Sequence, residues 1–172
     1  MSNPEVWLRG PLPDVIPELQ PVAHSLMQVR EEIAEAASVS VAQLWARPGG
    51  AASIGFHLMH LAGSLDRLLT YARGRTLNAA QRDALAAEDR EDTSRTAADL
   101  VTAALDALDR ALVQVQTTAL CTLDEAREVG RARLPSTVLG LLVHAAEHAQ
   151  RHSAQIITMR KVIGSRGDLV IG

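Results

Sequence analysis

Histidines are the residues of this sequence whose types and spacing could do chemistry. Five of the six histidines fall into two groups: His57 and His60 lie together, and the second group lies much later in the chain, at His144, His148 and His152. A neutral imidazole is a common ligand of divalent metal ions and can also act as a general acid or base. The grouping therefore indicates a histidine-based site. The sixth histidine, His24, stands apart from both groups and is interpreted as an ordinary hydrogen-bonded residue.

His148 and His152 form the strongest part of this pattern. They are four residues apart, so on a helix they share one face, with roughly 6 Å between their Cβ atoms. The same face carries apolar residues such as Leu141 and Ile156, which predicts that both imidazoles are buried. A buried polar group without a partner costs about 1–3 kcal/mol, and one shared metal ion would satisfy both rings. His144 lies at the edge of this stripe and is expected to flank the site.

A third ligand is expected from the other group, because two ligands are too few for a transition-metal site. A histidine from a facing helix would complete a three-histidine centre with positions left open for water or substrate. Both His57 and His60 are candidates. Helical periodicity favours His57 slightly, since it lies nearer the centre of a leucine stripe, but it does not decide between them. The alternative is a metal-free bundle in which buried histidines are held by hydrogen bonds.

Long amphipathic helices must position these histidines. Apolar residues recur at spacings of three and four over four segments, roughly 17–37, 53–73, 93–116 and 135–162. Ser53 and Thr93 are expected to cap the second and the third of them. Four such helices joined by loops predict an all-α fold, a four-helix bundle.

The expected domain organisation is an N-terminal arm over residues 1–16, the bundle domain over 17–163 and a C-terminal tail over 164–172. Short helices are expected near residues 41–45 and 79–87. The segment 117–134 is left open between an irregular and a strand-like crossing.

Composition and charge exclude several classes of partner. The formal net charge is −3, and the single lysine, Lys161, joins no basic run, so no nucleic-acid surface is expected. Cys121 is the only cysteine, which rules out an intramolecular disulfide and fits a reducing compartment. No apolar stretch approaches the ~20 residues of a membrane span, and the N-terminus has no signal-peptide pattern. We therefore expect a cytoplasmic protein that binds no membrane.

Other metal and catalytic motifs are missing from the sequence. A ferritin-like di-iron bundle needs Glu-x-x-His on two helices, but no histidine here has a glutamate three positions before it. The His-Glu-x-x-His pattern of zinc proteases, the Walker A loop and the Gly-rich dinucleotide loop are also missing. The two histidine groups remain the strongest functional signal.

Two runs of sequence resemble one known family. Residues 53–62, Ser-Ile-Gly-Phe-His-Leu-Met-His-Leu-Ala, followed by Asp66-Arg67-Leu68, resemble the second helix of the DinB/YfiT-like metalloenzymes. Residues 147–156, Glu-His-Ala-Gln-Arg-His-Ser-Ala-Gln-Ile, resemble the fourth-helix signature of that family, His-x-x-x-His-x-Gly-Gln. The resemblance covers roughly residues 17–163.

This resemblance implies a particular ligand set. In the family the ligand of the second helix directly precedes a Leu-Ala or Val-Ala pair, which here selects His60. The implied metal ligands are therefore His60, His148 and His152. This leaves His57 as a neighbour of the ligands or as pocket wall, and Gln155, which matches the signature, is expected close to His148. Together with His144, which flanks the stripe, they are the candidates that contact the ligands rather than the ion. Ala154 stands where the family usually has glycine, and because alanine is small and favours helix, little disturbance of the site is expected.

The resemblance also implies a helix order of up, down, down, up, a homodimer, and a nickel or zinc ion. Characterised members of the family are transferases and isomerases that use low-molecular-weight thiols such as bacillithiol, mycothiol or glutathione. The leading hypothesis is thus a divalent-metal-dependent enzyme, a thiol S-transferase with a small-molecule substrate and a thiol cosubstrate. The alternatives are a metal-dependent hydrolase and a non-catalytic, dimeric metal-binding module with a structural or sensing role.

Overall fold

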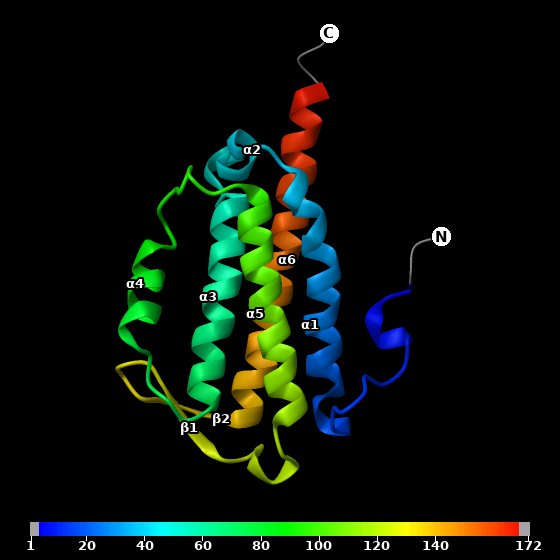
Figure 1. Cartoon of the computed structure of the whole chain (residues 1–172), viewed down its shortest axis with the longest axis vertical. Helices are drawn as coiled ribbons and strands as arrows, with labels where there is room; N and C mark the ends of the chain where they lie inside the picture. Colours follow the sequence, from blue (N-terminus) through cyan, green and yellow to red (C-terminus); the bar gives the residue numbers. More distant parts are fainter. Residues whose placement is uncertain (1–3, 169–172) are drawn as a thin grey trace.

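The structure, a computed structural model, describes the backbone of residues 4–168 and the side chains of residues 4–164. The described part is mostly helical, and four long helices form an elongated bundle (Figure 1). They are α1 (Gln20–Ile33), α3 (Ile54–Ala72), α5 (Ala97–Thr117) and α6 (Val138–Asp168). The prediction of a helical bundle is confirmed.

The chain passes through the bundle in the order up, down, down, up. In Figure 1, α1 and α6 run from the lower end to the upper end, and α3 and α5 run back. The parallel pair α3 and α5 needs a long return connection, and this connection contains the short helix α4 (Ala79–Ala87). Another short helix, α2 (Val41–Trp45), lies between α1 and α3 at the upper end.

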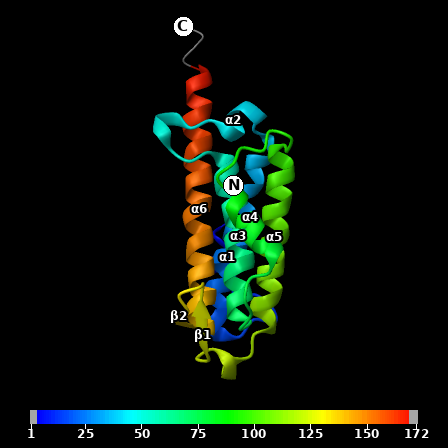
Figure 2. The ribbon, with the colours of Figure 1, turned by 90° about the vertical axis from the view of Figure 1, so that its left-hand side faces the viewer.

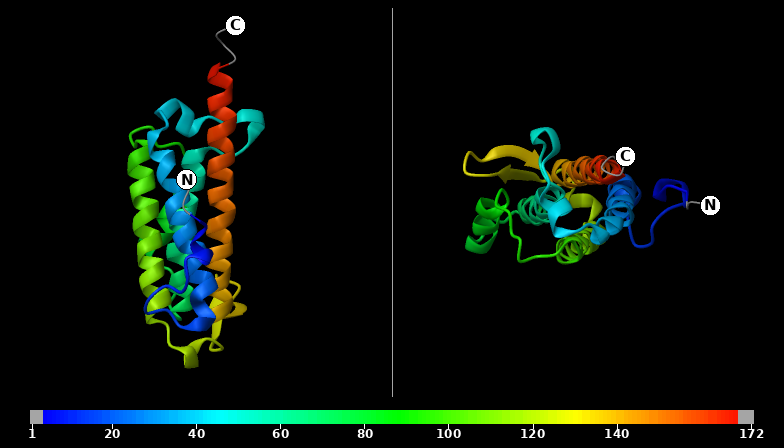
Figure 3. Two further views of the ribbon diagram at one scale, coloured as in Figure 1. Left: turned by 90° about the vertical axis from the view of Figure 1, so that its right-hand side faces the viewer. Right: turned by 90° about the horizontal axis from the view of Figure 1, so that it is seen from above.

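Viewed from above, α6 lies between α1 and α3, and α5 completes the ring between the same two helices (Figure 3). The core inside the ring consists mainly of leucine and alanine side chains from the predicted stripes. Fully buried examples are Leu58 and Leu61 in α3, Leu108 in α5 and Leu142 in α6. Small residues such as Ala149 allow the helices to approach closely. The adjacency of α3 and α6 is what the candidate site depends on.

Two helix starts follow from capping hydrogen bonds. Ser53 accepts a hydrogen bond from the backbone N–H of Phe56 at 3.1 Å, which confirms the predicted cap of α3. The predicted cap of α5 at Thr93 is wrong. Thr96 holds that position and forms a reciprocal capping box with Asp99, while Thr93 lies in the preceding turn.

A hairpin begins within the segment 117–134 that the sequence left open and extends beyond it to Thr137. Strands β1 (Ala126–Val129) and β2 (Leu134–Thr137) pair antiparallel, and the hairpin lies beside the lower ends of α3 and α6 (Figure 2). Because Pro135 belongs to β2, α6 begins at Val138 rather than at residue 135. The helix continues to Asp168, past the expected start of the tail at Gly164, and residues 169–172 of that tail lie outside the described part.

The expected N-terminal arm lies against α1, and its residues 1–3 are outside the described part. Arg9 forms an ion pair with Glu31 at 2.6 Å, and the Gln28 side chain accepts a hydrogen bond from the backbone of Val6 at 3.0 Å. Among the described residues, every helix is too short or too polar to cross a membrane.

Candidate metal centre

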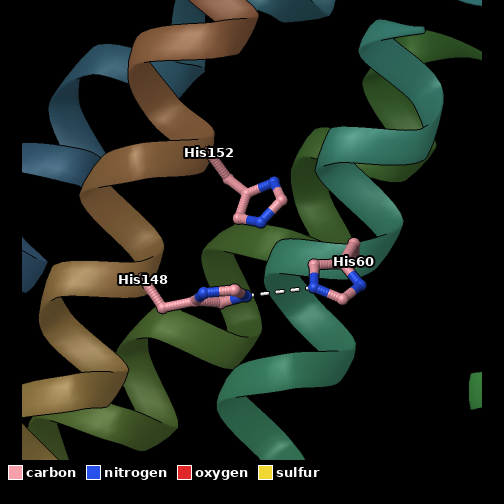
Figure 4. A group of neighbouring side chains, drawn as sticks. All are labelled: His60, His148 and His152. Carbon is pink, nitrogen blue, oxygen red and sulfur yellow. Dashed lines mark hydrogen bonds between the residues drawn. The ribbon is translucent and has the colours of Figure 1, made fainter. Parts of the chain in front are cut away.

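α3 and α6 bring three of the histidines to one point (Figure 4). His60 projects from α3, and His148 and His152 project from α6. Each ring offers one nitrogen such that these atoms all lie within 4.8 Å of one another. The Nε2 atoms of His60 and His148 are 3.0 Å apart, and the rings of His148 and His152 have centroids 4.6 Å apart. The ligand set that the sequence resemblance implied is therefore a spatial cluster that could hold a metal ion.

The cluster lies at the rim of the core rather than in its centre. His152 is buried, while His60 and His148 are half-buried. Burial, together with the neighbouring His60 and His148, lowers the pKa of His152 to about 3. Burial and the nearby His60 also lower the pKa of His148. Both rings are neutral at pH 7, so a nitrogen lone pair of each is available to a metal ion.

The second nitrogen of two of these rings is already engaged. His60 donates a hydrogen bond from Nδ1 to Glu88 Oε2 at 2.7 Å, and the Nδ1 atoms of His152 and His57 are 2.9 Å apart in a hydrogen bond. This leaves Nε2 of His60 and Nε2 of His152 as the nitrogens that could bind a metal ion. Nδ1 of His148 is buried and lacks a hydrogen-bond partner within the described residues. Three imidazole donors suit zinc and nickel, so these residues fit the ion that the resemblance implies.

Glu88 is the residue of this site that the sequence did not reveal. It follows α4 and is only 6% exposed. Arg67 of α3 donates to both carboxylate oxygens, with 3.3 Å between Nη2 and Oε2. Burial alone would raise the pKa of Glu88, but the hydrogen bonds from His60 and Arg67 outweigh it and hold that pKa below its usual value. Glu88 is therefore an ionised carboxylate in contact with a candidate ligand.

The sequence could have indicated Glu88 only indirectly, through Arg67. Arg67 lies seven residues, or two helical turns, after His60 on a helix whose buried residues are mostly apolar. A guanidinium in such a position is buried only when an acid pairs with it. The sequence offers several acids in the run from 88 to 92, and nothing local distinguishes Glu88 from the others.

His57 is the most buried histidine of α3, at 7% exposed. Burial, followed by the nearby His60, lowers its pKa. Its hydrogen-bond partner is His152, and Phe56 packs edge-on against it at a centroid distance of 5.4 Å. Phe56 also stacks on His60 at 5.4 Å. The leucine stripe thus predicted correctly that His57 is buried. His57 contacts the candidate ligand His152 but is not itself a member of the cluster.

The remaining histidines and Gln155 are not members of the cluster. The His144 ring is 5.5 Å from that of His148, and its side chain is 52% exposed beside Glu147. Gln155, three residues after His152, is exposed and makes no hydrogen bond to any histidine in the described part of the chain. His24 hydrogen-bonds the carbonyl of Gly10 at 3.0 Å, as an isolated histidine is expected to do.

Comparison with models of known protein families supports the resemblance found in the sequence. The model of the DinB superfamily matches residues 10–156, a span that includes α1, α3, α5 and the part of α6 that carries the clustered histidines. Among curated proteins, none matches the chain.

Proposed function

The chain belongs to the DinB superfamily, and from this premise we propose that it is a divalent-metal-dependent enzyme that transfers a low-molecular-weight thiol to a small electrophile. The observation that supports the proposal most is the cluster of His60, His148 and His152, whose ligand atoms lie within 4.8 Å of one another. Zinc and nickel are the proposed ions, because imidazole nitrogens suit both.

Three neutral imidazoles would leave the ion its full charge and at least one open position. When bound, the ion would act as a Lewis acid that stabilises the thiolate form of a thiol near neutral pH. In the transfer, the thiol sulfur would form a bond to an electrophilic carbon of the second substrate. The leaving group would depart with the bonding electron pair, and the thiol proton would pass to solvent.

The residues around the cluster would orient the ligands and admit the substrate. Glu88 holds His60 through Nδ1, and His57 holds His152 in the same way. The His60 side chain is 23% exposed, so part of the cluster faces solvent. Phe56 stacks on His60 and offers an apolar surface beside the proposed reaction site.

The alternative functions make different demands on the site. A structural or sensing ion would require a fourth protein ligand, and His57 and His144 are the nearest candidates. Neither residue belongs to the group whose ligand atoms lie within 4.8 Å of one another, which favours an open site. A hydrolase would use the same open position for water.

We further propose a homodimer, which light scattering of the metal-loaded protein would detect.

A panel of thiols tests the transferase directly. Protein loaded with zinc or nickel should accelerate conjugation of 1-chloro-2,4-dinitrobenzene with at least one of glutathione, cysteine, bacillithiol and mycothiol. The metal-free protein, and the His148→Ala variant treated with the same metal, should match the uncatalysed rate. Metal-dependent hydrolysis of an aryl ester without any thiol transfer would favour the hydrolase. No metal-dependent turnover of either kind would contradict the proposal and favour the non-catalytic module.

A further inference from the structure

We propose that Glu88 is a positioning residue of the metal centre, and that the outer helix α4 serves to deliver it to His60. This inference rests on the metal-binding part of the proposed function. It goes beyond that part, because it assigns a role to a residue and an element outside the four long helices.

α4 contributes little to the core of the protein. None of its residues, Ala79–Ala87, is buried, and the helix lies on the outer side of α3 (Figure 1, Figure 2). The residue that follows it, Glu88, is nevertheless 6% exposed. Gln81 fixes the beginning of α4 to α3 through hydrogen bonds to Asp66 at 2.7 Å and Thr70 at 2.8 Å. What α4 places inside the protein is therefore the Glu88 carboxylate.

The surface of α3 leaves room for this carboxylate at Gly63. A Cβ atom at position 63 would lie 2.7 Å from Nη1 of Arg67 and closer still to Oε1 of Glu88. Any larger residue would displace the Glu88–Arg67 pair. Gly63 lies about one helical turn from both His60 and Arg67, and it thus allows the Glu88–Arg67 pair to lie against the backbone of α3.

The hydrogen bond to Glu88 determines which nitrogen of His60 carries the proton. Because a carboxylate only accepts hydrogen bonds, the proton of the neutral ring lies on Nδ1, 2.7 Å from Oε2. Nε2 then presents its lone pair toward Nε2 of His148, 3.0 Å away. A carboxylate behind a histidine ligand orients the ring and makes it more basic, and loss of such a partner typically weakens metal binding about 10–100-fold.

A purely structural role for Glu88 is the competing explanation, since the buried Arg67 needs an acid in any case. The two explanations differ in whether the effect of Glu88 on metal affinity requires His60. A positioning residue acts on the ion through His60, so its effect on metal affinity disappears when His60 is absent. It also couples the ion to α4, and such coupling is reciprocal.

Zinc titrations with a competing chromophoric chelator test the role of Glu88. We expect Glu88→Gln to weaken zinc binding about 10-fold and Glu88→Ala about 10–100-fold, while the matched control Glu91→Gln, at an exposed residue paired with Arg47, binds as wild type does. In the His60→Ala background, Glu88→Gln should cause no further loss. Wild-type affinity in a folded Glu88→Gln protein, or an equal loss in both backgrounds, would overturn the inference.

Hydrogen exchange of the wild-type protein gives a second readout that needs no variant. Zinc should slow amide exchange in α4 and at Glu88, although no proposed ligand lies in that segment. Gly63→Ala should abolish this protection. Zinc bound to wild type with unchanged exchange in α4 would contradict the role of Glu88 alone, whereas a wild-type protein that binds neither zinc nor nickel would overturn the metal centre as well.

Discussion

His57 and His60 differ in what their side chains contact. The His60 ring belongs to the cluster with His148 and His152, whereas His57 hydrogen-bonds the far nitrogen of His152. A ligand supplies a bond to the ion, and its neighbour only orients a ligand. The two histidines should therefore contribute unequally to metal affinity.

This difference predicts the order of two substitutions. His60→Ala should reduce zinc affinity at least 100-fold, because it removes a ligand, and His57→Ala about 10-fold, because it removes a hydrogen bond to one. Isothermal titration of each variant measures both effects. The reverse order would show that His57, and not His60, is the ligand of α3.

Burial of the histidines predicts how stability depends on pH in the metal-free protein. The pKa of His152 is about 3 in the folded state and about 6.5 in an unfolded chain. Below pH 6.5 the unfolded chain takes up a proton that the folded protein does not, so the free energy of unfolding falls as the pH falls. His57 and His148, whose pKa values are also lowered, act in the same direction.

Urea denaturation at pH 7.5 and pH 5.5 measures this dependence. The wild-type protein should lose stability over the interval, by up to about 1.4 kcal/mol per pH unit for each histidine that the folded state keeps neutral. His152→Gln should lose less over the same interval. An equal loss in the variant would show that His152 does not carry the effect.

The residues of the site differ in how far their sequence context reveals them. The spacing of His148 and His152 places them on one helix face regardless of the rest of the fold. The choice of His60 over His57 required the family resemblance, because periodicity reports burial and both residues lie near the same stripe. Glu88 was not predictable, since its contact with His60 arises from the path of the chain between two helices.

At the scale of elements, the start of α3 depends on a close contact with α2. The Trp45 ring lies against Gly55, where an added Cβ would be 2.6–2.8 Å from three ring carbons. The tryptophan is buried and has little room to move. This contact fixes the end of α3 from which the histidines project.

Gly55→Ala should therefore destabilise the protein by about 1–3 kcal/mol, as overpacking of a core does. Gly164→Ala in α6 is the matched control, because nothing lies within 4 Å of a Cβ added there and alanine favours helix. Urea denaturation of both variants measures the difference. A Gly55→Ala variant as stable as the control would contradict the packing of Trp45 on α3.

An element was predictable where its buried residues recur at regular spacing in the sequence. The cores of α1, α3, α5 and α6 followed from their apolar stripes. The hairpin of β1 and β2 did not, because its short strands are held by pairing with each other and by a hydrogen bond from Arg127 to the carbonyl of Ala72 at 2.8 Å. α4 was expected as a short helix, but without a buried face its role could not be inferred.

At the scale of the whole molecule, the candidate centre joins helices that are far apart in the chain. His60 and His148 are separated by 88 positions, and they meet because α3 and α6 are neighbours in the ring of helices. Periodicity alone does not give the order of helices around a core. The two histidine groups predicted that α3 and α6 are neighbours. The positions of α1 and α5 around the core are known only from the structure.

The most direct test of this convergence is anomalous diffraction from crystals of the protein loaded with zinc or nickel. We expect one strong peak between α3 and α6, about 2.0–2.1 Å from a nitrogen of each of His60, His148 and His152. An ion bound elsewhere, or one bound without His60, would contradict it.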